Sequence, residues 1–272
     1  MNLQRFIEAK QDELAALRRC MPEALDEKAF FAAGKRPDFL QALNAPPPSD
    51  EPLRVIAEFK RSSPSEGVIN DRLAPDDAAQ QYAAGGATCM SVLTERRFFG
   101  GAPSDLFAAA PAGLPLLRKD FIFDELQVRE SFATPASALL LIVALTPDAE
   151  RLRGLRELAE SQGINAVVEI FSEAELETAR ESGARIIQVN ARNLESFRTD
   201  RLAGLQLASH RLPAECWIAA SAMSAPEHLL DAAQAGYRAA LIGTALMRAA
   251  HPQTQLRHLL HPHTPPQTTA QP

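Results

Sequence analysis

Eight short apolar segments, separated by stretches of helical character, are the feature that most restricts the folds open to this chain. Their apolar residues are continuous rather than alternating, which is typical of parallel strands covered on both faces. The predicted strands cover residues 54–59, 89–93, 114–117, 138–142, 166–170, 186–189, 216–219 and 239–242.

The segments between these runs have the spacing and the termini of helices. Gly163, Gly183 and Gly236 each lie just before a predicted strand, where a left-handed residue ends a helix. Ser172 and Glu175 have the spacing of a capping box. The predicted helices cover residues 75–84, 124–131, 147–162, 172–181, 200–209, 225–235 and 244–249.

Eight strand–helix units in about 200 residues predict an α/β fold, a (β/α)8 TIM barrel with an extra N-terminal helical segment. A doubly wound sheet is the alternative, but it usually has fewer strands and a glycine-rich first turn, and the chain contains no G-x-G-x-x-G. The N-terminal extension, residues 1–52, has an amphipathic helix at 2–19, a short helix at 25–33 and a proline-rich end. The barrel is expected over residues 53–250, and a helical fragment with a frayed tail over 251–272.

Charge and hydropathy exclude several other classes of protein. The net charge is −6, from 28 Lys and Arg against 34 Asp and Glu, so no basic excess points to nucleic acid. The mean hydropathy is −0.15, and the longest apolar run, residues 136–145, is about half a membrane span. The three cysteines form no C-x-x-C pair, which favours a reducing compartment. We expect a cytoplasmic protein without membrane or metal contacts, and the sequence is compatible with a monomer.

Charged residues lie where the active sites of such barrels are found, at the carboxyl ends of the strands. Glu58 and Lys60 flank one apolar residue and therefore face the same side of the first strand. Lys119 follows the third predicted strand, and Glu169 lies between two apolar residues of the fifth, where burial is expected. These four groups suit proton transfer; the alternative is a set of structural ion pairs at the rim.

The last predicted strand ends in Gly243 and Thr244, where a helix begins. Backbone N–H groups at such a turn can hold a phosphate, and Ser221 at the end of the seventh strand could contribute. An ordinary glycine turn explains the same residues. Loops 61–67 and 96–101 are placed to cover the mouth of the barrel, although the phenylalanines of the second loop could also pack inward.

Several motifs match one family in order along the chain. Residues 56–65 (IAEFKRSSPS), 91–95 (SVLTE) with 98–101 (FFGG), 117–122 (LRKDFI), 189–194 (VNARNL) and 241–247 (LIGTALM) resemble indole-3-glycerol phosphate synthase. The resemblance implies closure of the indole ring of 1-(2-carboxyphenylamino)-1-deoxyribulose 5-phosphate, with loss of CO2 and water. This reaction is a carboxy-lyase step of tryptophan biosynthesis. It needs a phosphorylated small molecule as substrate and neither a metal nor an organic cofactor.

The resemblance also implies roles for individual residues. Lys119 would be the general acid, with a pKa lowered by cations and apolar walls, and Glu169 the base of the later dehydration. Lys60 would bind the substrate carboxylate or position the partners of Lys119, while Glu58 and Asn190 would orient hydroxyls and lysines. The resemblance assigns the substrate pocket to Ser63, Phe98, Phe121, Arg192, Leu194 and Ser221, and the phosphate to the backbone of Ala222 and Gly243 with Thr244.

The chain departs from the family pattern at a few positions. Ala220 and Ala222 stand where the family usually has Glu and Gly, and an alanine would be strained if position 222 needs a positive φ. Phe171 stands at a position where the family often has a histidine. Residues 131–135 lack the Gly-Ala turn that is usual in the family. The alternative hypothesis is therefore a weakly active or non-catalytic paralogue that binds a related phosphorylated ligand. The E-F-K and R-K-D-F motifs argue against two related barrels, phosphoribosylanthranilate isomerase and the tryptophan synthase α chain.

Overall fold

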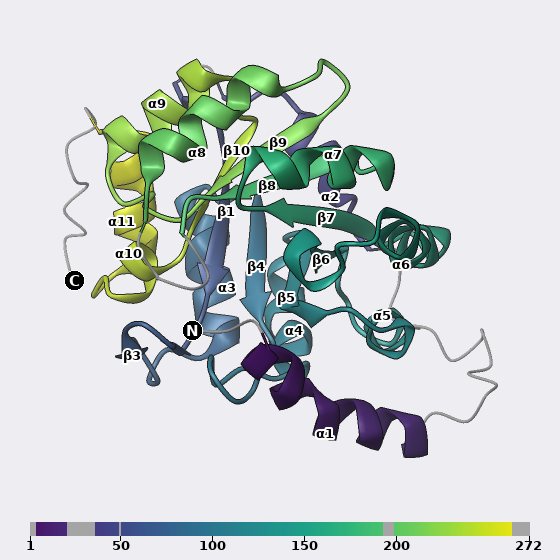
Figure 1. Ribbon diagram of the computed structural model, residues 1–272. Helices are drawn as coiled ribbons and strands as arrows, with labels where there is room; N and C mark the ends of the chain where they lie inside the picture. Colours follow the sequence, from purple (N-terminus) through teal and green to yellow (C-terminus); the bar gives the residue numbers. More distant parts are fainter. Residues whose placement is uncertain (1–3, 21–35, 49, 193–198, 263–272) are drawn as a thin grey trace.

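The computed structural model describes residues 4–20, 36–48, 50–192 and 199–262, and within them eight parallel strands close into a barrel (Figure 1). The first strand pairs with both the last and the second, which closes the sheet. The predicted barrel is thereby confirmed. Its strands are β1 (Arg54–Phe59), β4 (Cys89–Leu93), β5 (Leu116–Ile122), β6 (Ala138–Ile142), β7 (Asn165–Ile170), β8 (Ile186–Asn190), β9 (Cys216–Ala220) and β10 (Ala239–Ile242).

Helices surround the barrel, and none among the described residues is long and apolar enough to cross a bilayer. The short hairpin β2 (Ser62–Ser63) and β3 (Gly67–Val68) follows the first strand. The helices are α3 (Pro75–Gly85), α4 (Ser104–Ala109), α5 (Glu125–Phe132), α6 (Ala149–Ser161), α7 (Glu173–Glu181), α8 (Arg201–Leu207), α9 (Pro226–Ala235), α10 (Thr244–Met247) and α11 (Pro252–Leu260), with 3-10 turns η2 (Ala110–Ala112), η3 (Val143–Leu145) and η4 (Ala208–His210).

The side chains of each strand point alternately to the two faces of the barrel sheet, which produces two apolar layers, one outside the sheet and one inside the barrel. On β1, Val55, Ala57 and Phe59 belong to the layer between the strands and the outer helices. Ile56 belongs to the second layer, inside the barrel. Glu58 shares the inward parity of Ile56, so the first strand presents its carboxylate to the barrel interior.

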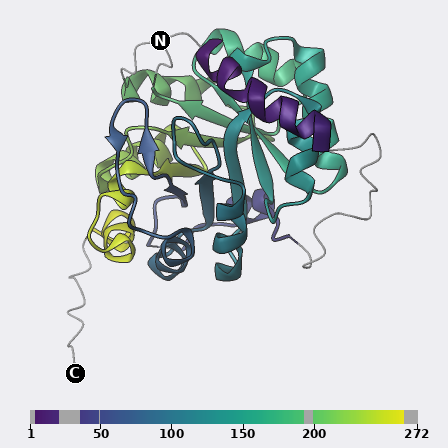
Figure 2. The same cartoon turned by 90° about the horizontal axis from the view of Figure 1, so that it is seen from below.

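Two N-terminal helices cover different parts of the barrel. The helix α2 (Phe39–Asn44) contacts β4 and β9, and its Phe39 and Leu43 are buried in the interior layer. The helix α1 (Gln4–Cys20) packs against β5 and α5. In Figure 1 it lies at the end of the barrel toward which β4 points, and Figure 2 looks at that end. The N-terminal segment therefore reaches the end of the barrel that carries the candidate site.

Several local predictions were wrong or lie outside the described residues. Residues 118–120 were expected to follow the third strand, but they lie inside β5, which continues to Ile122 with an irregular register. Ser172 makes no capping bond, and Glu175 accepts instead from the backbone N–H of Phe171. The capping box is at the start of α5, and α2 and α4 were not predicted. The expected helix at 25–33 and the tail after residue 262 lie outside the described residues.

The three helix-ending glycines were predicted correctly. Gly163, Gly183 and Gly236 have φ of 71°, 82° and 98°, in the left-handed region.

Candidate active site

A pocket opens at the carboxyl ends of the strands, with every barrel strand or the turn after it contributing to its wall. Most of the predicted site residues meet there, although they are spread over some 180 positions of the chain. Those lining the pocket are Glu58, Lys60, Ser63, Lys119, Phe121, Glu169, Asn190, Arg192, Ser221, Ala222, Gly243 and Thr244.

Glu58 is the centre of a buried ion pair with two lysines. Its Oε2 lies 2.8 Å from Nζ of Lys119, and its Oε1 lies 2.8 Å from Nζ of Lys60. The residue is only 3% exposed. Burial alone would raise the pKa of Glu58, but the two ammonium groups outweigh it and lower the pKa to about 2. Glu58 is therefore ionised and fixes both lysines.

Lys119 shows the opposite electrostatic balance from the one predicted. Burial acts to lower its pKa, but the carboxylates of Glu58 and Glu169 outweigh burial, so the pKa of Lys119 is raised. The expectation of a lowered pKa counted cations and apolar walls. It missed that Glu169, contributed by β7, faces the same ammonium group. Lys119 is therefore a protonated donor at neutral pH.

Glu169 is a buried carboxyl, 2% exposed. Burial raises its pKa, and this effect outweighs the favourable charge of Lys119 and the hydrogen bonds from Gln188 and Asn190. Asn190 is itself held, because its Oδ1 accepts from Ser221 Oγ at 2.7 Å and from the backbone N–H of Arg192 at 3.0 Å. A carboxyl with a raised pKa is a stronger base than an ordinary one.

The turn after β9 is strained. Ser221 has a φ of 71° and Ala222 a φ of 56°, the left-handed region that favours glycine. Both line the pocket beside the turn after the neighbouring strand β10. Gly243 in that turn has no room for a side chain, because a Cβ there would collide with the Glu58 carboxylate. Backbone therefore lies open to the pocket at these two turns, where the phosphate was expected.

The loop after β1 is tied across the mouth by arginines. Arg192 Nη1 donates to Ser65 Oγ at 2.8 Å. Arg248 Nη2 lies 2.8 Å from Glu66 Oε2, and Arg192 Nη2 lies 3.8 Å from Glu66 Oε1. Sequence reasoning placed this loop over the mouth but missed Glu66 and Arg248, whose pairing depends on elements far apart in the chain.

An aromatic wall closes another side of the pocket. Phe6 of α1 stacks on Phe121 with ring centroids 4.3 Å apart. Phe98, expected in the pocket, does not line it and instead meets Phe6 edge-on with ring centroids 5.1 Å apart, while Phe99 lines the pocket. Leu194, also expected in the pocket, lies outside the described residues. The contribution of Phe6 had no signal in the sequence beyond the apolar face of its helix.

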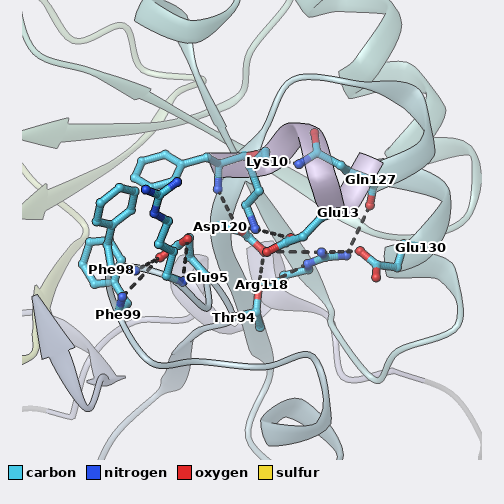
Figure 3. Close-up of polar contacts among 12 residues, drawn as sticks. Lys10, Glu13, Thr94, Glu95, Phe98, Phe99, Arg118, Asp120, Gln127 and Glu130 are labelled. Atoms are coloured by element: carbon cyan, nitrogen blue, oxygen red, sulfur yellow. Dashed lines mark hydrogen bonds and ion pairs between the residues drawn. The ribbon is translucent and has the colours of Figure 1, made fainter. Parts of the chain in front are cut away.

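A second network of charges lies beside the pocket and anchors this wall (Figure 3). Lys10 of α1, fully buried, reaches Asp120 Oδ1 at 2.6 Å, and Asp120 Oδ2 accepts from Thr94 at 2.7 Å. Glu95 accepts from the backbone N–H groups of Phe98 and Phe99, which fixes the aromatic loop. The network joins α1 to the residue next to Lys119.

The fold and the polar pocket define a TIM-barrel protein, and solved structures agree on that fold. The 3-hexulose-6-phosphate synthase structure superimposes with a TM-score of 0.61 at 17% identity, covering 76% of this chain and 100% of that chain. The N-acetylmannosamine-6-phosphate 2-epimerase from Clostridium perfringens gives 0.57 at 15%, covering 78% and 92%.

Sequence relationships then identify the family. Residues 3–259 match the model of indole-3-glycerol phosphate synthase. The protein of that name from Desulfosudis oleivorans is 38% identical, covering 95% of this chain and 98% of its own. Those from Micrococcus luteus (39%, 94% and 95%) and Chloroherpeton thalassium (41%, 90% and 94%) are similar. The chain belongs to the indole-3-glycerol phosphate synthase family, which confirms the resemblance and the class of enzyme predicted from the motifs.

Proposed function

We propose that the protein closes the indole ring of 1-(2-carboxyphenylamino)-1-deoxyribulose 5-phosphate in tryptophan biosynthesis, using Lys119 as acid and Glu169 as base. The observation that carries the proposal is the charge arrangement in this family member: a protonated lysine, held 2.8 Å from the buried carboxylate of Glu58, faces a second carboxyl with a raised pKa. Such a pair supplies a proton donor and a proton acceptor in one pocket.

Lys119 acts in the ring-closing step. As the aryl carbon that bears the carboxylate attacks the ketone, a carbon–carbon bond forms and the carbonyl electrons move to oxygen. The developing alkoxide is more basic than an amine, so Lys119 can donate its proton even with a raised pKa. Loss of CO2 then returns the electrons of the broken carbon–carbon bond to the ring and restores its aromaticity.

Glu169 acts in the final dehydration. Lys119, reprotonated from solvent, gives a second proton to the hydroxyl formed by ring closure, which leaves as water, and Glu169 accepts the proton that formation of the new double bond releases. Its raised pKa makes it a better acceptor than an exposed glutamate. Asn190 and Glu58 hold the two acid–base groups in place.

The substrate carries two anionic ends and one aryl ring, and the pocket offers a place for each. Lys60 binds the carboxylate or positions the partners of Lys119. The phosphate lies on the backbone of Ala222 and Gly243 beside Thr244. The aryl ring packs against Phe121, with Arg192 and Ser221, together with Ser63, along the remaining wall.

An assay for indole absorbance with the deoxyribulose phosphate substrate tests this function. We expect turnover by the unaltered protein and a loss of orders of magnitude in kcat for Lys119→Ala. Arg185→Ala, at an exposed position at the other end of the barrel, is the control and should retain activity. Turnover like that of the unaltered protein in Lys119→Ala would refute the role of this lysine.

The positive φ of Ala222 favours one alternative, a paralogue that binds the ligand but turns it over slowly. This alternative predicts that a reduced substrate analogue binds without comparable turnover. It also predicts a large gain in rate when Ala220→Glu and Ala222→Gly are combined. An unchanged rate in the double variant excludes it.

We further propose that the protein works as a monomer in the cytoplasm, without nucleic acid. Size-exclusion chromatography with light scattering should return the mass of one chain, 29.6 kDa. Cell fractionation should recover it with the cytosol.

A further inference from the structure

Gln188 is a polar side chain inside the barrel that the mechanism above does not use. It lies on β8, is fully buried, and pairs in register with Glu169 on β7 and with Ile218 on β9. Its Nε2 donates to Glu169 Oε2. Its Oε1 is buried and has no hydrogen-bond partner among the described residues.

An unpaired amide oxygen inside a barrel opposes folding. Burying such a group without a partner is unfavourable, whereas an apolar side chain of similar size fits between apolar strands. Val167 and Ile186 show that the neighbouring interior positions of the same two strands are apolar. The amide at position 188 is therefore explained by what its NH2 group does for Glu169, not by packing.

We propose that Gln188 is a positioning residue for Glu169. The NH2 group of Gln188 donates to the ionised carboxylate, and after the amide rotates, its oxygen accepts from the protonated carboxyl. The inference rests on the proposed role of Glu169 as the base of the dehydration. An ionised carboxylate only accepts hydrogen bonds, and a protonated one also donates. A glutamine amide carries both a donor and an acceptor on one rotatable group, and here the acceptor is unoccupied.

Asn190, the other amide beside Glu169, is not free to change in this way. Its Oδ1 already accepts from Ser221 and from the backbone of Arg192. Rotation of that amide would break both bonds, so its NH2 group stays directed at Glu169. Of the two amides, only that of Gln188 can rotate and accept a hydrogen bond when Glu169 becomes protonated.

The charged groups around Glu169 come from several elements. Lys119 of β5 favours its ionised form, and Glu58 of β1 opposes it. The charge of Glu169 acts to raise the pKa of Glu175 on α7. The charge of Arg192 acts to lower the pKa of Lys119. The positions in register on the two outer strands, Ile142 on β6 beside Glu169 and Ile218 on β9 beside Gln188, are uncharged. Replacing Gln188 by a neutral residue leaves all these charges unchanged, so a change in the titration of Glu169 does not come from an altered charge, and a repacking control isolates the lost hydrogen bond.

The test compares Gln188→Met with Ile218→Val, a control that trims the strand on the other side of Gln188 without touching a polar group. The carboxyl 13C resonance of Glu169, identified by its absence in Glu169→Gln, is titrated in the protein without substrate. The hydrogen bond to the ionised carboxylate is stronger than the one to the protonated carboxyl, so Gln188→Met should move the midpoint upward by about 1 pH unit. Ile218→Val should leave it in place.

Single-turnover rates provide the second readout. In Gln188→Met the acid limb of the rate profile should move by the same amount, kcat should fall at neutral pH, and KM should stay nearly constant. If this variant does not fold, Gln188→Leu replaces it. Leucine is also uncharged and lacks the NH2 donor, so its Glu169 midpoint should move upward by the same amount.

An unmoved Glu169 midpoint in a folded Gln188 variant overturns the inference, as does an equal movement in Ile218→Val. Failure of the proposed function looks different. In that case the unaltered protein shows no turnover, while the 13C titration still reports whether Gln188 acts on Glu169.

Discussion

Glu58 gives the folded protein a pH dependence of defined sign. Two ammonium groups lower its pKa from 4.5 to about 2. A lowered acid pKa contributes stability that is fully present above the unfolded value and is lost as pH falls through the folded value. The shift corresponds to about 3 kcal/mol, lost between about pH 4.5 and pH 2.

We predict that Glu58→Gln removes this part of the acid sensitivity. Urea unfolding at a series of pH values should show a shallower fall in the free energy of unfolding below pH 4.5 for the variant than for the unaltered protein. Glu8→Gln, exposed on α1, is the control and should retain the full slope. Equal slopes in Glu58→Gln and the unaltered protein would contradict the assignment.

Ala222 carries backbone strain that a glycine would relieve. Its φ of 56° costs an alanine about 1–2 kcal/mol, whereas glycine adds about 0.5–1 kcal/mol of unfolded-state entropy. We therefore predict that Ala222→Gly raises the free energy of unfolding by about 1 kcal/mol. The matched control, Ala174→Gly at an exposed position of α7, should lower it by about 1 kcal/mol, as measured by urea denaturation. A loss of stability in both variants would show that position 222 is not strained.

At the scale of elements, α1 is held to the barrel by buried contacts next to the site. Lys10 pairs with Asp120 at 2.6 Å, and the same helix places Phe6 on Phe121. Because Asp120 neighbours Lys119 in β5, the docking of α1 and the shape of the aryl pocket depend on the same strand.

We predict that Lys10→Met releases this helix. Without Lys10, the buried Asp120 carboxylate keeps only Arg118, 3.4 Å away, as a cationic partner among the described residues, at a cost of up to about 3 kcal/mol. Trypsin should then cleave faster after Arg18 and Arg19, and KM should rise because Phe6 leaves the wall. Gln11→Met introduces the same side chain at an exposed position one residue away and should change neither quantity. Unchanged proteolysis and KM in Lys10→Met would refute the coupling.

The elements also show where apolar patterning succeeds and where it cannot. The bounds of β1, β4, β6 and β10 follow from apolar runs alone, because most of their side chains are apolar and buried. In β5 the charged residues are paired: Arg118 is buried against Glu130 and Asp120. The apolar run therefore ends at residue 117, although β5 continues to Ile122. The sequence prediction accordingly placed Lys119 after the strand, whereas it lies within it.

The site could be predicted as a set of strand-end residues, but its electrostatics could not. The parity of Glu58 and Lys60 followed from strand geometry, and the motifs brought in Lys119 and Glu169. The raised pKa of Lys119 depends on two carboxylates from opposite parts of the chain. The contact of Gln188 with Glu169 could not be predicted. Gln188 lies inside an apolar run, and a single polar residue there does not indicate which side chain of the next strand it contacts.

At the scale of the whole molecule, the pocket exists only while the barrel is closed. Its walls come from every strand, and its polar groups are separated by long stretches of chain. A ligand that fills it therefore binds the folded state and has no equivalent site on the unfolded chain. Net charge gives no hint of this, because the overall value of −6 conceals a pocket where lysines and arginines alternate with carboxylates.

We predict that the product, indole-3-glycerol phosphate, stabilises the protein by mass action. At a free concentration of 100 times Kd, the free energy of unfolding should rise by about 2.7 kcal/mol, which for a chain of this size raises Tm by roughly 5–10 °C. Indole and glycerol phosphate, each alone at the same concentration, should give smaller shifts because each fills one part of the pocket. A thermal shift no larger than that produced by equimolar sulfate would mean that the pocket recognises only an anion, and the proposed ligand would then be wrong.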